Sequence, residues 1–151
     1  ETSNITVPEM KAKLRRLKPA PDLVVIDYLG LMKSAKATEN RVQEVSEISR
    51  NLKIMAKELK VPVIACAQLS RGTEAKGKSH KPALADLRDS GSIEQDADIV
   101  MFLHRDRKEI GEDKHVQDAK CIVAKQRNGA TGPVDLVFLS SFTKFENKAE
   151  E

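Results

Sequence analysis

The first 20 residues have the apolar spacing of an amphipathic helix. The apolar side chains recur three or four positions apart, at Val7, Met10, Leu14 and Leu17. Thr6 can cap the start of this helix, because Glu9 follows three residues later as in a capping box and Pro8 lies in the first turn. Pro19 and Pro21 cannot continue a helix, so we expect the helix to end before them.

A longer helix is predicted over residues 41–59, and Asn40 and Gln43 can cap its start. Its apolar residues are Val42, Val45, Ile48, Leu52, Met55 and Leu59. Residues 22–27 and 61–67 flank the helix. The first segment has four apolar residues in a row between two Asp residues and the second is almost wholly apolar, which is typical of strands buried on both faces of a parallel sheet. Strand, helix and strand then form a right-handed βαβ unit.

The middle of the chain alternates between polar stretches and short elements. Residues 71–81 have no apolar periodicity and are predicted to form a loop. Ser92 can cap a short helix over residues 93–96, and residues 97–103 have the apolar character of a third strand. The charged residues 105–118 are predicted to form a loop or the tip of a hairpin.

The last third of the chain has the pattern of antiparallel strands. Short strands are predicted over residues 120–125, 134–139 and 142–145. The pair Asn128-Gly129, after the first of these, is typical of the primed turns that close hairpins. The sequence therefore predicts an α/β fold that begins with a parallel sheet and helices and ends in antiparallel strands.

Composition narrows the possible functions. Lys and Arg number 26 against 23 Asp and Glu, so the net charge of +3 permits nucleic-acid contact without arguing for it, and most charges are expected to be solvated. Aromatic residues make up 3% of the chain and Trp is absent, which argues against a base-stacking platform. No apolar run approaches the roughly 20 residues of a membrane span, and no signal peptide is evident, so a cytoplasmic protein is expected.

The cysteines and histidines suggest no metal centre. Cys66 and Cys121 each lie inside an apolar run and are expected to be buried, reduced and structural. The three histidines lack the spacing of metal ligands, so no structural zinc is expected.

Two polar residues follow the predicted parallel strands. Asp27 stands at the carboxyl end of the first, where α/β sheets bind ligands, and could hold Mg²⁺ beside nucleotide phosphates. Gln68 follows the second strand and could sense a phosphate or orient a water. Each also has a simpler interpretation, because strands often end in Asp for capping or solubility, and a terminal Gln often bonds to nearby backbone.

Two groups of basic residues could contact phosphates. Arg88, Asp89 and Gly91 precede a helix start, and with Arg71 they flank the predicted loop; Arg88 could instead pair with a neighbouring Asp. Lys125 and Arg127 are two positions apart at a strand end and share a face. They could meet the γ-phosphate of a nucleotide on a neighbouring subunit, with Arg127 as an arginine finger, or form a solvated hairpin end.

The order of these segments resembles the C-terminal ATPase domain of DnaB-type replicative DNA helicases. The resemblance covers nearly the whole chain and is carried by residues 23–29 (LVVIDYL), 63–71 (VIACAQLSR), 82–100 (PALADLRDSGSIEQDADIV) and 124–132 (AKQRNGATG). The segment from Leu87 to Ile99 argues against a RecA-like recombinase. Two residues depart from the usual pattern, because Gly30 stands where the family commonly has Gln and Asp89 where it has Glu.

The resemblance implies a role for each of these residues. Asp27 would be the Walker B aspartate that helps hold Mg²⁺, and Gln68 would link the state of a bound ATP to the DNA-binding loops. Lys125 and Arg127 would reach the γ-phosphate on the adjacent subunit. The DNA-binding residues would be Arg71, Arg88, Asp89 and Gly91.

The family also implies assembly and partners. A homo-hexamer would encircle single-stranded DNA and unwind duplex at replication forks, with a primase and a helicase loader as protein partners. The implied fold is part of a RecA-like P-loop NTPase core, with residues 1–151 forming the C-terminal part of one motor domain.

One expected motif is absent from these 151 residues. No segment has the pattern G-x-x-x-x-G-K-[S/T] that cradles nucleotide phosphates, and the glutamate that follows this loop in the family is missing too. We therefore expect these residues to be part of a longer motor and to turn over no ATP alone. The alternative is a non-catalytic module that binds single-stranded DNA or a partner protein.

Overall fold

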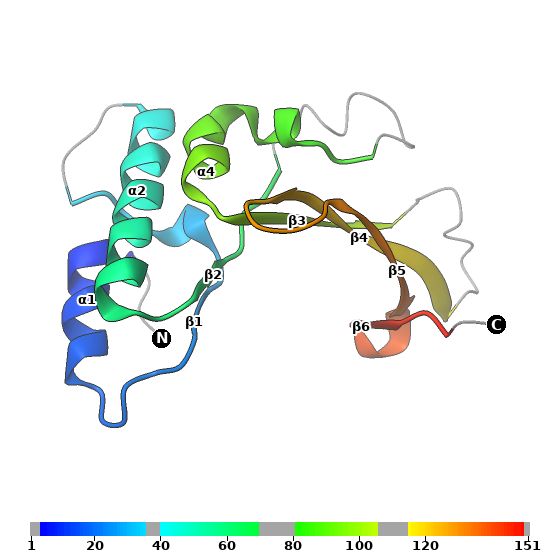
Figure 1. The fold of residues 1–151 in the computed structure, drawn as a ribbon, viewed down its shortest axis with the longest axis horizontal. Helices are drawn as coiled ribbons and strands as arrows, with labels where there is room; N and C mark the ends of the chain where they lie inside the picture. The colour runs from blue at the N-terminus through cyan, green and yellow to red at the C-terminus, as the bar shows by residue number, and fades with distance from the viewer. Residues whose placement is uncertain (1–3, 36–39, 70–80, 106–114, 150–151) are drawn as a thin grey trace. The chain divides into compact units, whose positions relative to one another are not determined.

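The computed structural model describes residues 4–35, 40–69, 81–105 and 115–149. The chain divides into two compact units (Figure 1). The first unit comprises residues 1–69 and 87–97, and the second comprises residues 70–86 and 98–151.

In its described residues, the first unit contains a two-stranded parallel sheet and three α-helices. The strands are β1 (Val24–Ile26) and β2 (Val63–Ala65), and the short 3-10 turn η1 (Leu29–Leu31) follows β1. The helices are α1 (Val7–Arg16), α2 (Arg41–Leu59) and α4 (Gly91–Asp96). Helix α2 packs against both other helices and lies between them (Figure 1). The predicted βαβ unit is therefore confirmed as β1, α2 and β2.

The core of the first unit lies between the helices and one face of the parallel sheet. Val24 and Ile26 of β1 pack with Ile48, Leu52 and Met55 of α2, and Ile48 and Met55 are almost fully buried. The other face of β1 carries Val25, whose side chain is 59% exposed. The prediction that these strands are buried on both faces is therefore wrong for the described residues, because the helices pack on one face only.

Both long helices begin where their capping residues predict. Thr6 and Glu9 form a reciprocal capping box, in which the Thr6 N–H donates to the Glu9 carboxylate at 2.9 Å and the Thr6 hydroxyl accepts from the Glu9 N–H at 3.4 Å. The Asn40 side chain accepts from the Val42 N–H at 2.9 Å. These bonds satisfy backbone donors that have no partner within the helix, so they fix where each helix starts.

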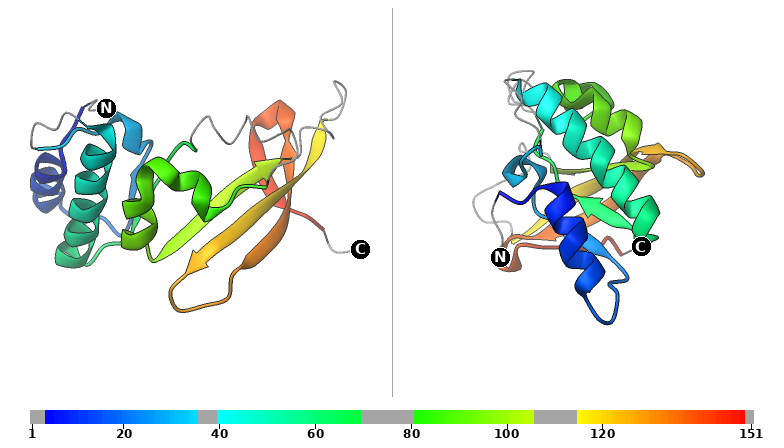
Figure 2. Two further views of the ribbon diagram at one scale, coloured as in Figure 1. Left: turned by 90° about the horizontal axis from the view of Figure 1, so that it is seen from above. Right: turned by 90° about the vertical axis from the view of Figure 1, so that its left-hand side faces the viewer.

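The second unit is built on a four-stranded antiparallel sheet. Figure 2 shows its long, twisted strands. The strands are β3 (Ile99–Arg105), β4 (Val116–Gln126), β5 (Gly132–Leu139) and β6 (Lys144–Asn147), in that order across the sheet. The 3-10 turns η2 (Leu84–Ser90) and η4 (Ser140–Phe142) precede α4 and β6. The predicted antiparallel ending is confirmed.

The start of β4 lies four residues before the predicted strand. Gln117 and Ala119 are buried while Val116 and Asp118 are exposed, so the side chains alternate as on a strand with one covered face. The polar character of Gln117 and Asp118 concealed this alternation in the sequence. Arg105 explains part of the burial of Gln117. Its guanidinium lies 4.1 Å from the centre of the Phe138 ring and donates a hydrogen bond to the Gln117 side chain at 3.2 Å.

Three local predictions are wrong. Asn128 and Gly129 have no positive φ, so they do not form a primed turn, and the longer segment 127–131 joins β4 to β5. Ser92 lies inside α4 rather than capping it, and its buried hydroxyl makes no hydrogen bond among the described residues. Cys66 is exposed rather than buried, because it lies beyond the end of β2. No described helix is both long and apolar enough to span a membrane.

Candidate functional site

Asp27 directly follows β1 and is exposed at the carboxyl end of the parallel sheet. Backbone hydrogen bonds fix the chain on both sides of it. The Ile26 carbonyl accepts from the Cys66 N–H at 2.9 Å, and the Leu29 N–H donates to the Cys66 carbonyl at 2.9 Å. The Asp27–Tyr28 peptide bond is cis. The two backbone hydrogen bonds with Cys66 fix the chain from which the carboxylate projects, and Asp27 follows the end of a strand as the sequence predicts.

A small hollow lies beside this aspartate. Its volume is about 190 Å³, and Asp27 lines it together with apolar side chains that include Met10, Val25 and Leu31. Among the described residues that line it, Asp27 is the only one with a carboxylate. Proteins usually hold Mg²⁺ through one or two carboxylates while the ion keeps several waters and phosphate ligands. A single exposed carboxylate at a strand end fits that role.

Gln68 is exposed at the same edge of the sheet. Because β1 and β2 run parallel in register, with Ile26 opposite Ala65, their carboxyl ends lie at one edge. Gln68 does not end its strand as expected, since β2 stops at Ala65, three residues earlier. The structure thus brings Asp27 and Gln68 to the same edge, with Gln68 on the segment that leaves it.

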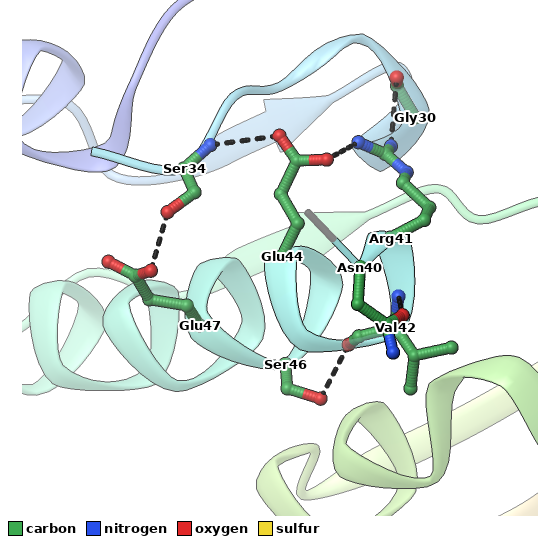
Figure 3. Close-up of polar contacts among 8 residues, drawn as sticks. All are labelled: Gly30, Ser34, Asn40, Arg41, Val42, Glu44, Ser46 and Glu47. Atoms are coloured by element: carbon green, nitrogen blue, oxygen red, sulfur yellow. Dashed lines mark hydrogen bonds and ion pairs between the residues drawn. The ribbon is translucent and has the colours of Figure 1, made fainter. Parts of the chain in front are cut away.

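A set of polar contacts ties the segment after Asp27 to the start of α2 (Figure 3). Arg41 donates to the Gly30 carbonyl at 3.0 Å and forms an ion pair with Glu44. Glu44 accepts from the Ser34 N–H at 3.2 Å, and the Ser34 hydroxyl donates to Glu47. We call Gly30, Ser34, Arg41, Glu44 and Glu47 the α2 clasp. The clasp holds the backbone that follows Asp27 against a helix of the core.

The clasp also sets the charge state of one carboxyl group. The hydrogen bond from Arg41, and after it the one from the Ser34 N–H, lowers the pKa of Glu44 below the ordinary value of 4.5. Glu44 therefore remains ionised in mildly acidic solution, and its bonds persist there. The spacing of Arg41 and Glu44 on one helix face could have been noticed in the sequence, but the contacts to Gly30 and Ser34 depend on the fold.

Gly30 packs closely against the side chain of Tyr28. A Cβ added there would lie 2.2 Å from the Tyr28 ring, much closer than non-bonded atoms approach. The Tyr28 ring therefore occupies the space that a side chain at position 30 would enter.

Lys125 and Arg127 lie in the second unit, at and just beyond the end of β4. The Arg127 N–H donates to the Asp98 carbonyl at 2.9 Å, and its guanidinium pairs with the Asp98 carboxylate at 3.3 Å. The Arg127 side chain is 51% exposed. Sequence reasoning missed Asp98, which belongs to the segment before β3. A half-exposed guanidinium carries donors for a further anion.

The predicted DNA-binding residues are located only in part. Arg71 lies outside the described residues. Arg88 and Asp89 lie in η2, where the structure describes their backbone but not their side chains. Gly91 is the first residue of α4. A Cβ added at Gly91 would meet no described atom within 4 Å.

Comparison with known proteins identifies the family. The model of the family "DnaB-like helicase C terminal domain" matches residues 1–147.

This chain belongs to the DnaB-like helicase C-terminal domain family.

The DnaB-like relatives have high identity over almost all of this chain. The replicative DNA helicase DnaB of Leifsonia xyli subsp. xyli is 50% identical over 151 residues, covering 99% of this chain and 33% of the relative. The replicative DNA helicase DnaC of Bacillus subtilis is 51% identical over 150 residues, with 97% and 33% covered. This chain thus spans about a third of the length of these relatives.

Solved structures show the same DnaB-like fold. A structure described as a DnaB-like replicative helicase and its interactions with primase matches with a TM-score of 0.86 and 41% identity, over 99% of this chain and 37% of that one. A solved ATPase domain matches with a TM-score of 0.85 and 41% identity, over 97% and 52% of the two chains. The predicted fold class, part of a RecA-like core, is therefore confirmed.

Proposed function

We propose that these residues work as the C-terminal part of one motor domain in a replicative DNA helicase that couples ATP hydrolysis to movement along single-stranded DNA. The observation that carries the proposal is the family match over residues 1–147. The exposed Asp27 at the carboxyl edge of a parallel sheet and the exposed Arg127 beyond β4 support it, since they supply a metal-binding carboxylate and a phosphate-binding cation.

In this proposal, ATP binds between subunits of a homo-hexamer. Asp27 helps hold Mg²⁺, which neutralises charge on the phosphates when bound, and Gln68 senses the nucleotide from the same sheet edge. Lys125 and Arg127 reach the γ-phosphate of the neighbouring subunit, where a guanidinium stabilises the charge of the transition state. Residues outside this chain supply the phosphate-binding loop, so these 151 residues alone turn over no ATP.

The proposed DNA contact is made by the segment around η2 and the start of α4. Arg71, Arg88, Asp89 and Gly91 follow the phosphates of single-stranded DNA, so binding is largely independent of base sequence. A primase and a helicase loader are the proposed protein partners, and the cytoplasm is the proposed location. The solved relative studied with primase supports the first of these partners.

The test of the nucleotide site is Arg127→Ala in the full-length protein that contains these residues. We expect ATP turnover to fall by roughly three to five powers of ten, because the transition state loses its cation. Nucleotide binding is measured separately and should change little. Arg16→Ala, which removes an exposed arginine from α1, is the matched control and should leave turnover intact. Unchanged turnover in Arg127→Ala would contradict the proposed role.

A further inference from the structure

We infer that Asp98 is a positioning residue for Arg127, holding one edge of its guanidinium so that the other edge is presented to an incoming phosphate. The inference rests on the proposed function, since it assigns how the finger of that site is oriented. The sequence contains no motif or spacing that would pair Asp98 with Arg127, because the strands β3 and β4 lie between them along the chain.

The backbone places the two residues directly opposite each other. Ile99 pairs with Gln126 at the end of the β3–β4 ladder, and the Arg127 N–H donates to the Asp98 carbonyl at 2.9 Å one step beyond it. Side chains that face each other across antiparallel strands lie close enough for opposite charges to attract. The ion pair at 3.3 Å is therefore built on a hydrogen-bonded backbone rather than on two free side chains.

A β-bulge in β4 determines which residue meets Asp98. Met101 pairs with Val123 and Val100 pairs with Lys125, so Ala124 is an extra residue in β4. Without it, Val100 would face Ala124 and Asp98 would face Gln126. Bulges commonly re-aim side chains next to functional sites. Here the bulge brings the cation Arg127, rather than a neutral amide, opposite the carboxylate.

The geometry of the pair leaves the guanidinium able to bind an anion. The contact to the Asp98 carboxylate is made through Nη1, and the Arg127 side chain remains 51% exposed. A guanidinium has five N–H donors in a planar fork, so one edge can rest on a carboxylate while another engages a phosphate. Exposed ion pairs contribute little to folding stability. Orientation of Arg127 is thus a better account of this pair than stabilisation of the sheet.

If Asp98 orients Arg127, its removal changes the kinetics of ATP turnover in a way that a purely structural role of Asp98 would not. A finger that acts on the transition state changes kcat rather than the affinity for ATP. Without Asp98, Arg127 keeps its charge but samples more side-chain conformations. We expect Asp98→Ala to lower kcat about tenfold and to change KM by less than about twofold. A misplacement of about 1 Å can cost about a hundredfold in rate, and the displacement here is smaller because Arg127 keeps its backbone hydrogen bond to residue 98. Asp98→Glu should recover most of the lost rate.

The test is a double-mutant cycle on the full-length protein, with ATP turnover and KM measured for Asp98→Ala, Arg127→Ala and the double variant. The inference requires that Asp98→Ala lower kcat alone but cost nothing further once Arg127 is absent. Asp118→Ala is the matched control, since it removes an equally exposed carboxylate that pairs with Lys148 on the same sheet, and it should leave kcat unchanged.

Two results would overturn the inference, and they are distinguishable from failure of the proposed function. If Asp98→Ala leaves kcat unchanged, or lowers it by the same factor with and without Arg127, Asp98 does not act through Arg127. In both cases a large effect of Arg127→Ala alone would keep the finger assignment intact. If Arg127→Ala itself has no effect, the proposed function of this site fails, and the positioning role of Asp98 fails with it.

Discussion

Asp27 and Arg127 carry opposite charges, and each lies exposed at the end of a strand on a backbone fixed by hydrogen bonds. The backbone at Asp27 is fixed by Cys66 of the neighbouring segment, and the backbone at Arg127 by Asp98. In the proposed function the two side chains meet the nucleotide from different subunits. A backbone fixed in advance favours ligand binding at each of them, because little motion must be frozen when the ligand binds.

Arg88 is the residue for which DNA binding can be tested most simply. We expect Arg88→Ala in the full-length protein to weaken binding of single-stranded DNA and to reduce the slope of log K against log[salt] by about 0.7. The slope falls because one fewer counterion is released when one fewer phosphate is neutralised. The measurement is a titration of labelled oligonucleotide at several salt concentrations.

Lys144→Ala is the matched control for this titration. Lys144 is an exposed cation that pairs with Glu146 in β6, and its removal should leave the slope unchanged. An Arg88 variant with the slope of the wild type would show that Arg88 makes no phosphate contact.

At the scale of single residues, the position of a side chain can be predicted from the sequence more readily than its partner. The position of Asp27 could be predicted, because an acidic residue directly after an apolar run marks a strand end. The partner of Arg127 could not be predicted, since the pairing with Asp98 depends on the register of β3 and β4 and on the extra residue Ala124. An uninterrupted ladder, the simplest assumption, would have placed Gln126 there.

At the scale of elements, helices were predictable and strand ends were less so. Helix α2 begins and ends where its apolar spacing and the Asn40 cap predict, because both signals are local in sequence. The strand β4 was predicted too short, because Gln117 is polar yet buried. The α2 clasp was not predicted, since Ser34 meets Glu44 and Glu47 only after α2 has packed on the sheet.

The clasp makes the stability of the first unit depend on pH. The pKa of Glu44 is lowered in the folded chain, chiefly by the hydrogen bond from Arg41, so ionised Glu44 stabilises the fold at pH values above its ordinary pKa of 4.5. That contribution is lost as the pH falls below 4.5 and through the lowered pKa. We expect Glu44→Gln to lower the melting temperature of the chain near neutral pH and to make it less sensitive to acid.

The measurement is thermal unfolding of the wild-type chain and Glu44→Gln between about pH 6 and about pH 3. The two melting temperatures should approach each other at the acidic end. Arg41→Ala is the companion variant, and Glu44→Gln should add little in its presence, because the largest cause of the lowered pKa has been removed. Parallel curves for wild type and Glu44→Gln would show that the clasp carboxylate does not contribute in this way.

At the scale of the whole molecule, the proposal places each nucleotide site between two copies of this chain. One unit carries the carboxylate and amide of the site, and the other carries its cations. The relatives are three times as long as this chain, and the phosphate-binding loop pattern is absent from its 151 residues. The account therefore requires both a longer chain and a neighbouring subunit for ATP turnover.

The most direct test of this central claim mixes two inactive variants. Subunits carrying Asp27→Ala keep the cation that serves a neighbour, and subunits carrying Arg127→Ala keep an intact carboxylate. The two full-length variants are co-expressed with different tags, purified through both, and assayed for ATP turnover beside each variant alone.

The account predicts that the mixed assembly recovers up to about a quarter of wild-type turnover, since a random arrangement gives that fraction of complete interfaces in a ring of head-to-tail subunits. Mixed assemblies that contain both variants and yet remain as inactive as either variant alone would contradict a nucleotide site shared between subunits.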